Sequence, residues 1–184
     1  MKATQITFEK SFLIQSHALV ECLVRLGEME VSQNVEFENL KDKIYGQTAK
    51  IIKKSHPEVP IFKGQGSLLT VFYLLLVLPH ELIGQEKLVK AYDMTKAEEI
   101  AAAASLNVAN SYKPTKPILT HFRNALSHGR IGWNNNRLTI SDVMQRAKVT
   151  SKFYAEFTME GLGEIAQELN MAFAMYVETA LKKR

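Results

Sequence analysis

The strongest constraint on this 184-residue chain is an apolar run from Leu68 to Leu78, which polar groups interrupt at only two positions. A helix needs about 20 apolar residues to cross a bilayer, so this run is too short for that role. A helix that is apolar on nearly every side has to be surrounded by protein. The run therefore predicts a core helix over about residues 67–83, in which Pro79 should kink or end the helix. We expect no membrane association.

Amphipathic patterns predict further helices around this core. The last of them should begin after Thr158, whose hydroxyl can cap it, and it carries one apolar stripe. That stripe consists of Leu162, Ile165, Leu169, Phe173, Tyr176 and Ala180. The other expected helices cover about residues 4–27, 36–55, 96–110 and 117–128, and a loop is expected over 59–66.

The apolar spacing changes to a period of two after residue 130. Ile131 and Trp133 alternate with other residues, and three asparagines at 134–136 then favour a turn with left-handed backbone conformations. Alternation returns at 153–157, which indicates a small antiparallel sheet of two or three strands. We therefore predict a mainly α fold: a single domain over 1–184, built as a bundle of about five to six helices with a β insertion at about 130–157.

Composition places the chain among ordinary soluble globular proteins, with 46% hydrophobic and 23% charged residues. The net charge of +4 is mild, and no dense basic patch of the kind found in duplex-DNA binders is present. Cys22 is the only cysteine, and no Cys/His cluster has zinc-ligand spacing, so we expect neither disulfide, metal nor cofactor. A reducing, cytoplasmic location is expected, because the N-terminus has no apolar signal core.

The residues that can carry chemistry lie in the expected helix 117–128. Its apolar residues cover one arc of the helix, and the opposite arc is polar but free of acidic residues. That polar arc contains Thr120, His121, Arg123, Asn124, Ser127 and His128. All of these groups can hydrogen-bond to a phosphate or a ribose hydroxyl, and none would repel one. Asn124 and His128 are four residues apart, so the amide can orient the imidazole.

Structural interpretations of the same residues remain open. His128 precedes Gly129 and can act as a cation at a helix C-terminus. Arg123 can form a salt bridge with a glutamate of another helix, and His121 fits a structural position better than a catalytic one. In these structural interpretations the side chains contact other parts of the same protein, whereas in the functional one they contact a phosphate or a ribose.

The segment Arg123-Asn-Ala-Leu-Ser-His128 resembles the Arg-x(4–6)-His motif of HEPN domains, in which a polar residue commonly follows the arginine. The helix that ends in the motif, the β-hairpin and the C-terminal helix together resemble a plasmid- and genome-encoded bacterial branch of that family, over roughly residues 5–182. HEPN toxins that pair with nucleotidyltransferase antitoxins usually carry a tyrosine two positions after the histidine. This chain has Arg130 there, so that kind of antitoxin and regulation by tyrosine modification are in doubt.

The resemblance implies a metal-independent endoribonuclease that acts as a homodimer on RNA, compatible with a role as a toxin or in defence. His128 would be the general base or acid, Arg123 would hold the scissile phosphate, and Asn124 would position His128 or bind phosphate. Ser127 and His121 would contact the substrate. The products would be a 2′,3′-cyclic phosphate and a 5′-hydroxyl. One alternative is an inactive HEPN module that binds RNA, a nucleotide or a protein partner, and a weaker one is a purely structural dimeric bundle.

Overall fold

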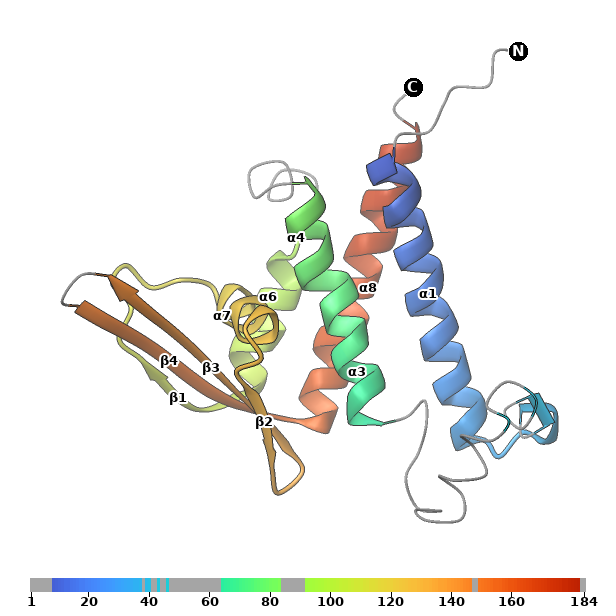
Figure 1. The fold of residues 1–184 in the computed structure, drawn as a ribbon, viewed down its shortest axis with the longest axis horizontal. Coiled ribbons are helices and arrows are strands. Elements are labelled where there is room, and N and C mark those ends of the chain that lie inside the picture. The colour runs from blue at the N-terminus through green and yellow to red at the C-terminus, as the bar shows by residue number, and fades with distance from the viewer. Residues whose placement is uncertain are drawn as a thin grey trace. The chain divides into compact units, whose positions relative to one another are not determined.

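The computed structural model shows a mainly helical protein with one four-stranded antiparallel sheet (Figure 1). It describes residues 8–37, 39, 40, 43, 46, 64–83, 92–146 and 149–182. The chain forms two compact units, one made of residues 1–17 and 72–184 and the other of residues 18–71. The expected mainly α fold with a small β insertion is confirmed.

The smaller unit contains most of the first helix and the beginning of the apolar run. Helix α1 spans Phe8–Val31, close to the predicted 4–27, and helix α3 begins at Gln65 and ends at Phe72. The expected helix at 36–55 and the expected loop at 59–66 lie mostly outside the described residues, and the last two residues of the expected loop, Gln65 and Gly66, belong to α3. Those that are described at 35–37, 39, 40, 43 and 46 are helical.

The apolar run continues as a helix past Pro79, through the π-helical segment η1 (Tyr73–Val77) and helix α4 (Leu78–Ile83). In η1 the backbone N–H of Leu78 donates to the carbonyl of Tyr73, five residues back. A π-helical turn inserts one residue into the helix and loosens its regular hydrogen bonding next to a residue that has no N–H to donate. The chain therefore accommodates Pro79 without ending the helix there, and Leu74 to Val77 are buried.

The expected helix at 96–110 is correct only in its first part. Helix α6 spans Thr95–Ala104, and strand β1 then spans Ser105–Asn110. Strand β1 pairs antiparallel with strand β4 (Val149–Thr158), with an irregularity between Leu106 and Ala109 where Asn107 has a φ of 51°. The alanine run favours a helix locally, but pairing with a strand more than 40 residues later in the chain overrides that preference.

The sheet has the strand order β1-β4-β3-β2, in which β2 spans Ile131–Asn134 and β3 spans Arg137–Arg146. Strands β2 and β3 form the predicted hairpin, and both turn residues, Asn135 and Asn136, have positive φ angles, as a two-residue type I′ turn requires. The sheet thus has four strands where two or three were expected, because the segment 105–110 joins it.

Helix α8 (Met159–Lys182) packs against α6 and completes the core of the larger unit. As predicted, the Thr158 hydroxyl caps its start, accepting a hydrogen bond from the Gly161 N–H at 3.2 Å. A Cβ atom at Gly161 would come within 2.8 Å of the Ala104 Cβ, so this glycine permits the close approach of α6 and α8. The predicted stripe is buried at Leu162, Ile165, Leu169 and Phe173, and Tyr176 is half-buried. Ala180 lies outside the residues whose side chains are described.

Helix α7 (Ile118–Ser127), at the predicted position, packs against β3, η1 and α6, so that it is held between the sheet and the helices (Figure 1). Its apolar face is anchored by Phe122, whose ring lies 4.7 Å from that of Phe72 and 5.5 Å from that of Phe157. This packing fixes which face of α7 is left for its polar residues. In the described parts of the chain, no helix is both long and apolar enough to cross a membrane.

Candidate active site on helix α7

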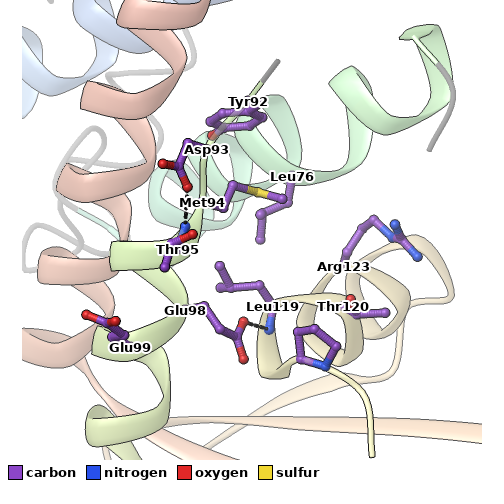
Figure 2. Close-up of a pocket in the computed structure, with 11 residues that line it drawn as sticks. Leu76, Tyr92, Asp93, Met94, Thr95, Glu98, Glu99, Leu119, Thr120 and Arg123 are labelled. Atoms are coloured by element: carbon purple, nitrogen blue, oxygen red, sulfur yellow. Dashed lines mark hydrogen bonds between the residues drawn. The ribbon is translucent and has the colours of Figure 1, made fainter. Parts of the chain in front are cut away.

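The N-terminal end of α7 is held by a side chain from another helix. Both carboxylate oxygens of Glu98 on α6 accept hydrogen bonds from the first backbone N–H groups of α7, those of Ile118 and, at 2.9 Å, Leu119. Figure 2 shows the bond to Leu119. These N–H groups have no partner inside the helix, and a carboxylate also suits the positive end of the helix dipole. Glu98 therefore fixes where α7 begins.

The C-terminal end of α7 is closed by the backbone alone. Gly129 has a φ of 63°, its N–H donates to the Leu126 carbonyl at 3.2 Å, and the Arg130 N–H donates to the Ala125 carbonyl at 2.8 Å. These two bonds form a Schellman motif, in which glycine adopts the left-handed conformation that other residues avoid. The imidazole of His128 is therefore not needed to cap the last carbonyls, which weakens the purely structural interpretation of that residue.

A buried polar cluster lies between the middle of α7 and the sheet. Asp142 on β3 accepts hydrogen bonds on the same carboxylate oxygen, Oδ2, from His121 Nδ1 at 2.8 Å and from Asn124 Nδ2 at 3.1 Å. His121 is 0% exposed and Asp142 is 4% exposed. The His121 ring stacks on Phe153 with ring centroids 4.0 Å apart. The Tyr112 ring packs edge-on against the same imidazole, with centroids 4.6 Å apart. The cluster joins α7 firmly to β3.

The charges in this cluster follow from burial and hydrogen bonding. Burial by itself would raise the pKa of Asp142, but the bonds from His121 and Asn124 bring that pKa below its ordinary value. Burial lowers the pKa of His121, although Asp142 opposes that shift. The pair is thus a neutral imidazole whose Nδ1–H donates to an ionised carboxylate. Burial and the nearby Asp142 raise the pKa of Tyr112 to about 12.

Arg123 is half-buried and is connected to this cluster through its neighbour. Its Nη2 donates to Asn124 Oδ1 at 3.0 Å, so the Asn124 amide bridges the guanidinium and Asp142. Burial lowers the pKa of Arg123, and the carboxylates of Glu81 and Asp142 oppose that shift. A guanidinium nevertheless stays protonated in proteins, so Arg123 is a partly desolvated cation. Such a cation binds an anion more strongly than a fully hydrated one does.

A cavity of about 400 Å³ lies beside Arg123, between η1, α6 and α7. Leu76, Met94 and Leu119 form its apolar walls, and Figure 2 shows the Arg123 side chain on the far side of this space from Glu98. The carboxylate of Glu98 is occupied by the α7 backbone. Arg123 lines the same cavity with its side chain, and Figure 2 shows its guanidinium pointing away from Glu98.

His128 and Ser127 end the polar face and are both exposed. The structure gives neither side chain a hydrogen bond within the described ranges, and His128 is linked to Asn124 only through the bond from its backbone N–H to the Asn124 carbonyl, at 3.1 Å. The predicted orientation of His128 by the Asn124 amide therefore has a competitor, because that amide is bonded to Asp142 and Arg123. That Asn124 positions His128 or binds phosphate stays a prediction, and in the structure the Asn124 amide contacts Arg123 and Asp142.

The predicted substrate contact of His121 is not compatible with its position. The ring is fully buried against Phe153 and its Nδ1 is bonded to Asp142, so a substrate cannot reach it in this structure. The structural interpretation of His121 is the one that its surroundings support. The other open alternative was a salt bridge between Arg123 and a glutamate of another helix. Among the described residues the structure shows no such salt bridge, although the charge of Glu81 opposes the lowering of the Arg123 pKa by burial.

Asp142 is the residue that the sequence did not reveal. The polar arc of α7 has no acidic residue, but β3 supplies a carboxylate to it from a different part of the chain. A signal was present: Leu138, Ile140 and Asp142 alternate along β3 and all three are buried. An acidic residue in register with two core residues of a strand is a candidate for a buried polar contact. Among the residues that the structure describes, no group of three His, Cys, Asp or Glu side chains is arranged to hold a metal ion.

Comparison with known proteins agrees with this architecture. A family model described as HEPN pEK499 p136 matches residues 1–179, nearly the whole chain. No curated protein and no solved structure gives a match. The family match covers α7, the hairpin and almost all of α8, which are the elements that carry the Arg-x(4)-His segment and its surroundings. The chain belongs to the HEPN family described as HEPN pEK499 p136.

Proposed function

We propose that this protein is a metal-independent endoribonuclease of the HEPN type that cleaves RNA as a homodimer. The observation that carries the proposal is the state of the two motif residues: the imidazole of His128 is exposed, and the guanidinium of Arg123 is partly exposed and oriented by Asn124. A proton-transfer group and an anion-binding group are thus available on one helix. Family membership supports this combination as a ribonuclease-like module.

In the proposed reaction, the 2′-oxygen of the substrate attacks the neighbouring phosphorus. A bond from the 2′-oxygen to phosphorus forms, and the bond from phosphorus to the 5′-oxygen breaks. The proton of the 2′-hydroxyl goes to a base, and an acid supplies a proton to the leaving 5′-oxygen. The products are a 2′,3′-cyclic phosphate and a 5′-hydroxyl.

His128 suits either proton transfer, because an imidazole can accept or donate a proton near neutral pH. Arg123 is proposed to bind the scissile phosphate and to offset the negative charge that develops on its oxygens. One copy of the chain contributes one such imidazole, and a homodimer would supply a second for the opposite transfer. Ser127, exposed at the end of the same face, is proposed to contact the substrate.

The test uses purified protein, single-stranded RNA and an excess of EDTA. Replacing His128 with alanine should lower the cleavage rate by about 100-fold or more, because a general acid or base contributes that much. Arg123→Ala should cause a loss of about the same size. Arg137→Ala is the matched control, since Arg137 is an exposed arginine on β3 that bonds Glu156 instead, and its rate should stay near that of the wild type.

Equal cleavage by the wild type and the His128→Ala variant would contradict the catalytic role, and so would the absence of cleavage by all four proteins. RNA binding that falls steeply with salt, without turnover, would instead indicate the inactive RNA-binding module. A sedimentation measurement on the same samples tests the homodimer. A toxin or defence role is tested separately, by comparing growth on expression of the wild type and of His128→Ala.

A further inference from the structure

We infer that Asp142 is a positioning residue for Arg123, acting through the side-chain amide of Asn124. This inference rests on the proposed function of Arg123 and deepens it. It assigns a role to a residue of β3 that lies outside the Arg-x(4)-His segment. Three contacts connect Asp142 to its surroundings and to Arg123: Asp142 with His121, Asp142 with Asn124, and Asn124 with Arg123.

The first step is the orientation of the amide. A carboxylate accepts hydrogen bonds and cannot donate them, whereas an asparagine side chain has one accepting and one donating end. Because Asp142 Oδ2 lies 3.1 Å from the amide nitrogen, the NH₂ group of Asn124 must face β3. The carbonyl oxygen then faces the other way, where it accepts from Arg123 at 3.0 Å. An amide turned by 180° would place its NH₂ group against the guanidinium, and both contacts would be lost.

The second step is the rigidity of Asp142 itself. It lies within the paired part of the sheet, opposite Phe153 of β4 in the register of β3 and β4. Its carboxylate is buried and receives a second hydrogen bond from His121, whose ring is held against Phe153. Burial of an ionised group is costly unless such donors surround it, so the carboxylate has a strong reason to keep both bonds. The amide is therefore held by an anchor that cannot easily rotate.

The third step concerns what this leaves for Arg123. A guanidinium has five N–H donors in a planar fork, and the structure assigns one of its terminal nitrogens to Asn124. Arg123 is only half-buried, and a long side chain in that situation would otherwise populate several rotamers. Holding one edge of the fork leaves its remaining donors to meet a phosphate in a defined direction. Defined placement of a binding group can change a reaction rate by about 100-fold.

The test compares two substitutions of Asp142 with two controls, in RNA cleavage with EDTA. Asp142→Ala removes the acceptor, and we expect kcat to fall by about 10- to 100-fold with a much smaller change in KM, because the charge of Arg123 is still present. Asp142→Asn is the conservative variant. Its amide oxygen can occupy the position of Oδ2 and keep both bonds, so its kcat should stay within a few-fold of the wild type.

The controls separate positioning from loss of stability. Leu169→Ala weakens the core at α8 and leaves all three contacts and the packing around His121 in place, and Tyr112→Phe removes a hydroxyl near Asp142. Both should keep kcat near the wild-type value below their melting temperatures. If Asp142→Ala keeps wild-type kcat while folded, or if Leu169→Ala loses as much kcat as Asp142→Ala at equal stability, the inference is overturned.

A second readout does not depend on activity. In the nitrogen-15 NMR spectrum, the two side-chain amide protons of Asn124 should be resolved and slow to exchange in the wild type, Asp142→Asn and Tyr112→Phe. In Asp142→Ala they should exchange rapidly. If the wild-type protein cleaves no RNA, the proposed function fails while this measurement still decides on the positioning. Rapid exchange already in the wild type would overturn the inference even in an active enzyme.

Discussion

Helix α7 and the residue that caps its C-terminus carry two histidines, seven residues apart, in opposite environments. His121 in the middle of the helix is fully buried, stacked on Phe153 and bonded to Asp142. His128 at the C-terminal end is exposed, and the backbone around Gly129 closes the helix without its ring. The middle of α7 is thus committed to holding the helix against the sheet, whereas its end is left accessible.

This difference shows that the same residue type serves stability or chemistry according to what surrounds it. An imidazole that is buried and bonded to a carboxylate has a fixed tautomer and no access to a substrate. An exposed imidazole can exchange protons with a bound molecule. The motif arginine lies between the two regions, since Arg123 is half-buried and is connected to the buried cluster through Asn124.

The comparison predicts that alanine substitution of the two histidines changes the free energy of unfolding by very different amounts. His121→Ala should lower the free energy of unfolding by about 3 kcal/mol, because it leaves a cavity and removes a donor from a buried carboxylate. His128→Ala should change it by no more than about 0.5 kcal/mol, as is usual at an exposed position. Urea titrations at neutral pH measure both values. Similar losses for the two variants would remove the distinction between the two regions.

The second prediction concerns the two ends of α7. A side chain, that of Glu98, holds the N-terminal end, whereas backbone hydrogen bonds close the C-terminal end. Glu98→Ala should lower the free energy of unfolding by about 1–2 kcal/mol, because two N–H groups at the helix start lose their charged acceptor. Glu99→Ala is the matched control, since Glu99 is the exposed neighbour on α6, and it should stay within about 0.5 kcal/mol of the wild type. If the two variants unfold at the same urea concentration, Glu98 does not hold the helix start.

Local signals in the sequence were sufficient for much of this region. The position of α7, the hairpin turn at Asn135 and Asn136 and the capping role of Thr158 all depend on residues close together in the chain, and all three predictions are confirmed. The polar face of α7 was visible for the same reason, because helical geometry alone decides which residues share it.

The contacts that the sequence did not reveal join distant parts of the chain. Strand β1 follows an alanine-rich helix without a break, and it forms only because β4 provides a partner. The carboxylate of Asp142 reaches α7 through the packing of β3 on that helix, which no local pattern describes. The burial of His121 has the same origin. Local periodicity therefore identified the helix that carries the candidate site, and tertiary packing decided which of its residues are accessible.

The smallest expected effect is a pH dependence that comes from His121. The pKa of His121 is lowered in the folded protein, chiefly by burial, so the unfolded chain takes up a proton at this residue when the pH falls through about 6.5 while the folded chain does not. The free energy of unfolding should therefore decrease on acidification from pH 7.5 to 5.5, by at most about 1.4 kcal/mol for each pH unit below 6.5. Asp142 stays ionised over this range, because its own pKa is lowered as well.

Urea titrations of the wild type and of His121→Asn across this pH range isolate the contribution of His121. The stability difference between the wild type and His121→Asn should shrink as the pH falls, because the wild type alone pays for keeping His121 neutral. A difference that grows on acidification would mean that His121 becomes protonated in the folded state and pairs with Asp142 as an imidazolium. In that case the buried region would gain a charge pair at low pH, and the contrast between the two histidines would lie in accessibility alone.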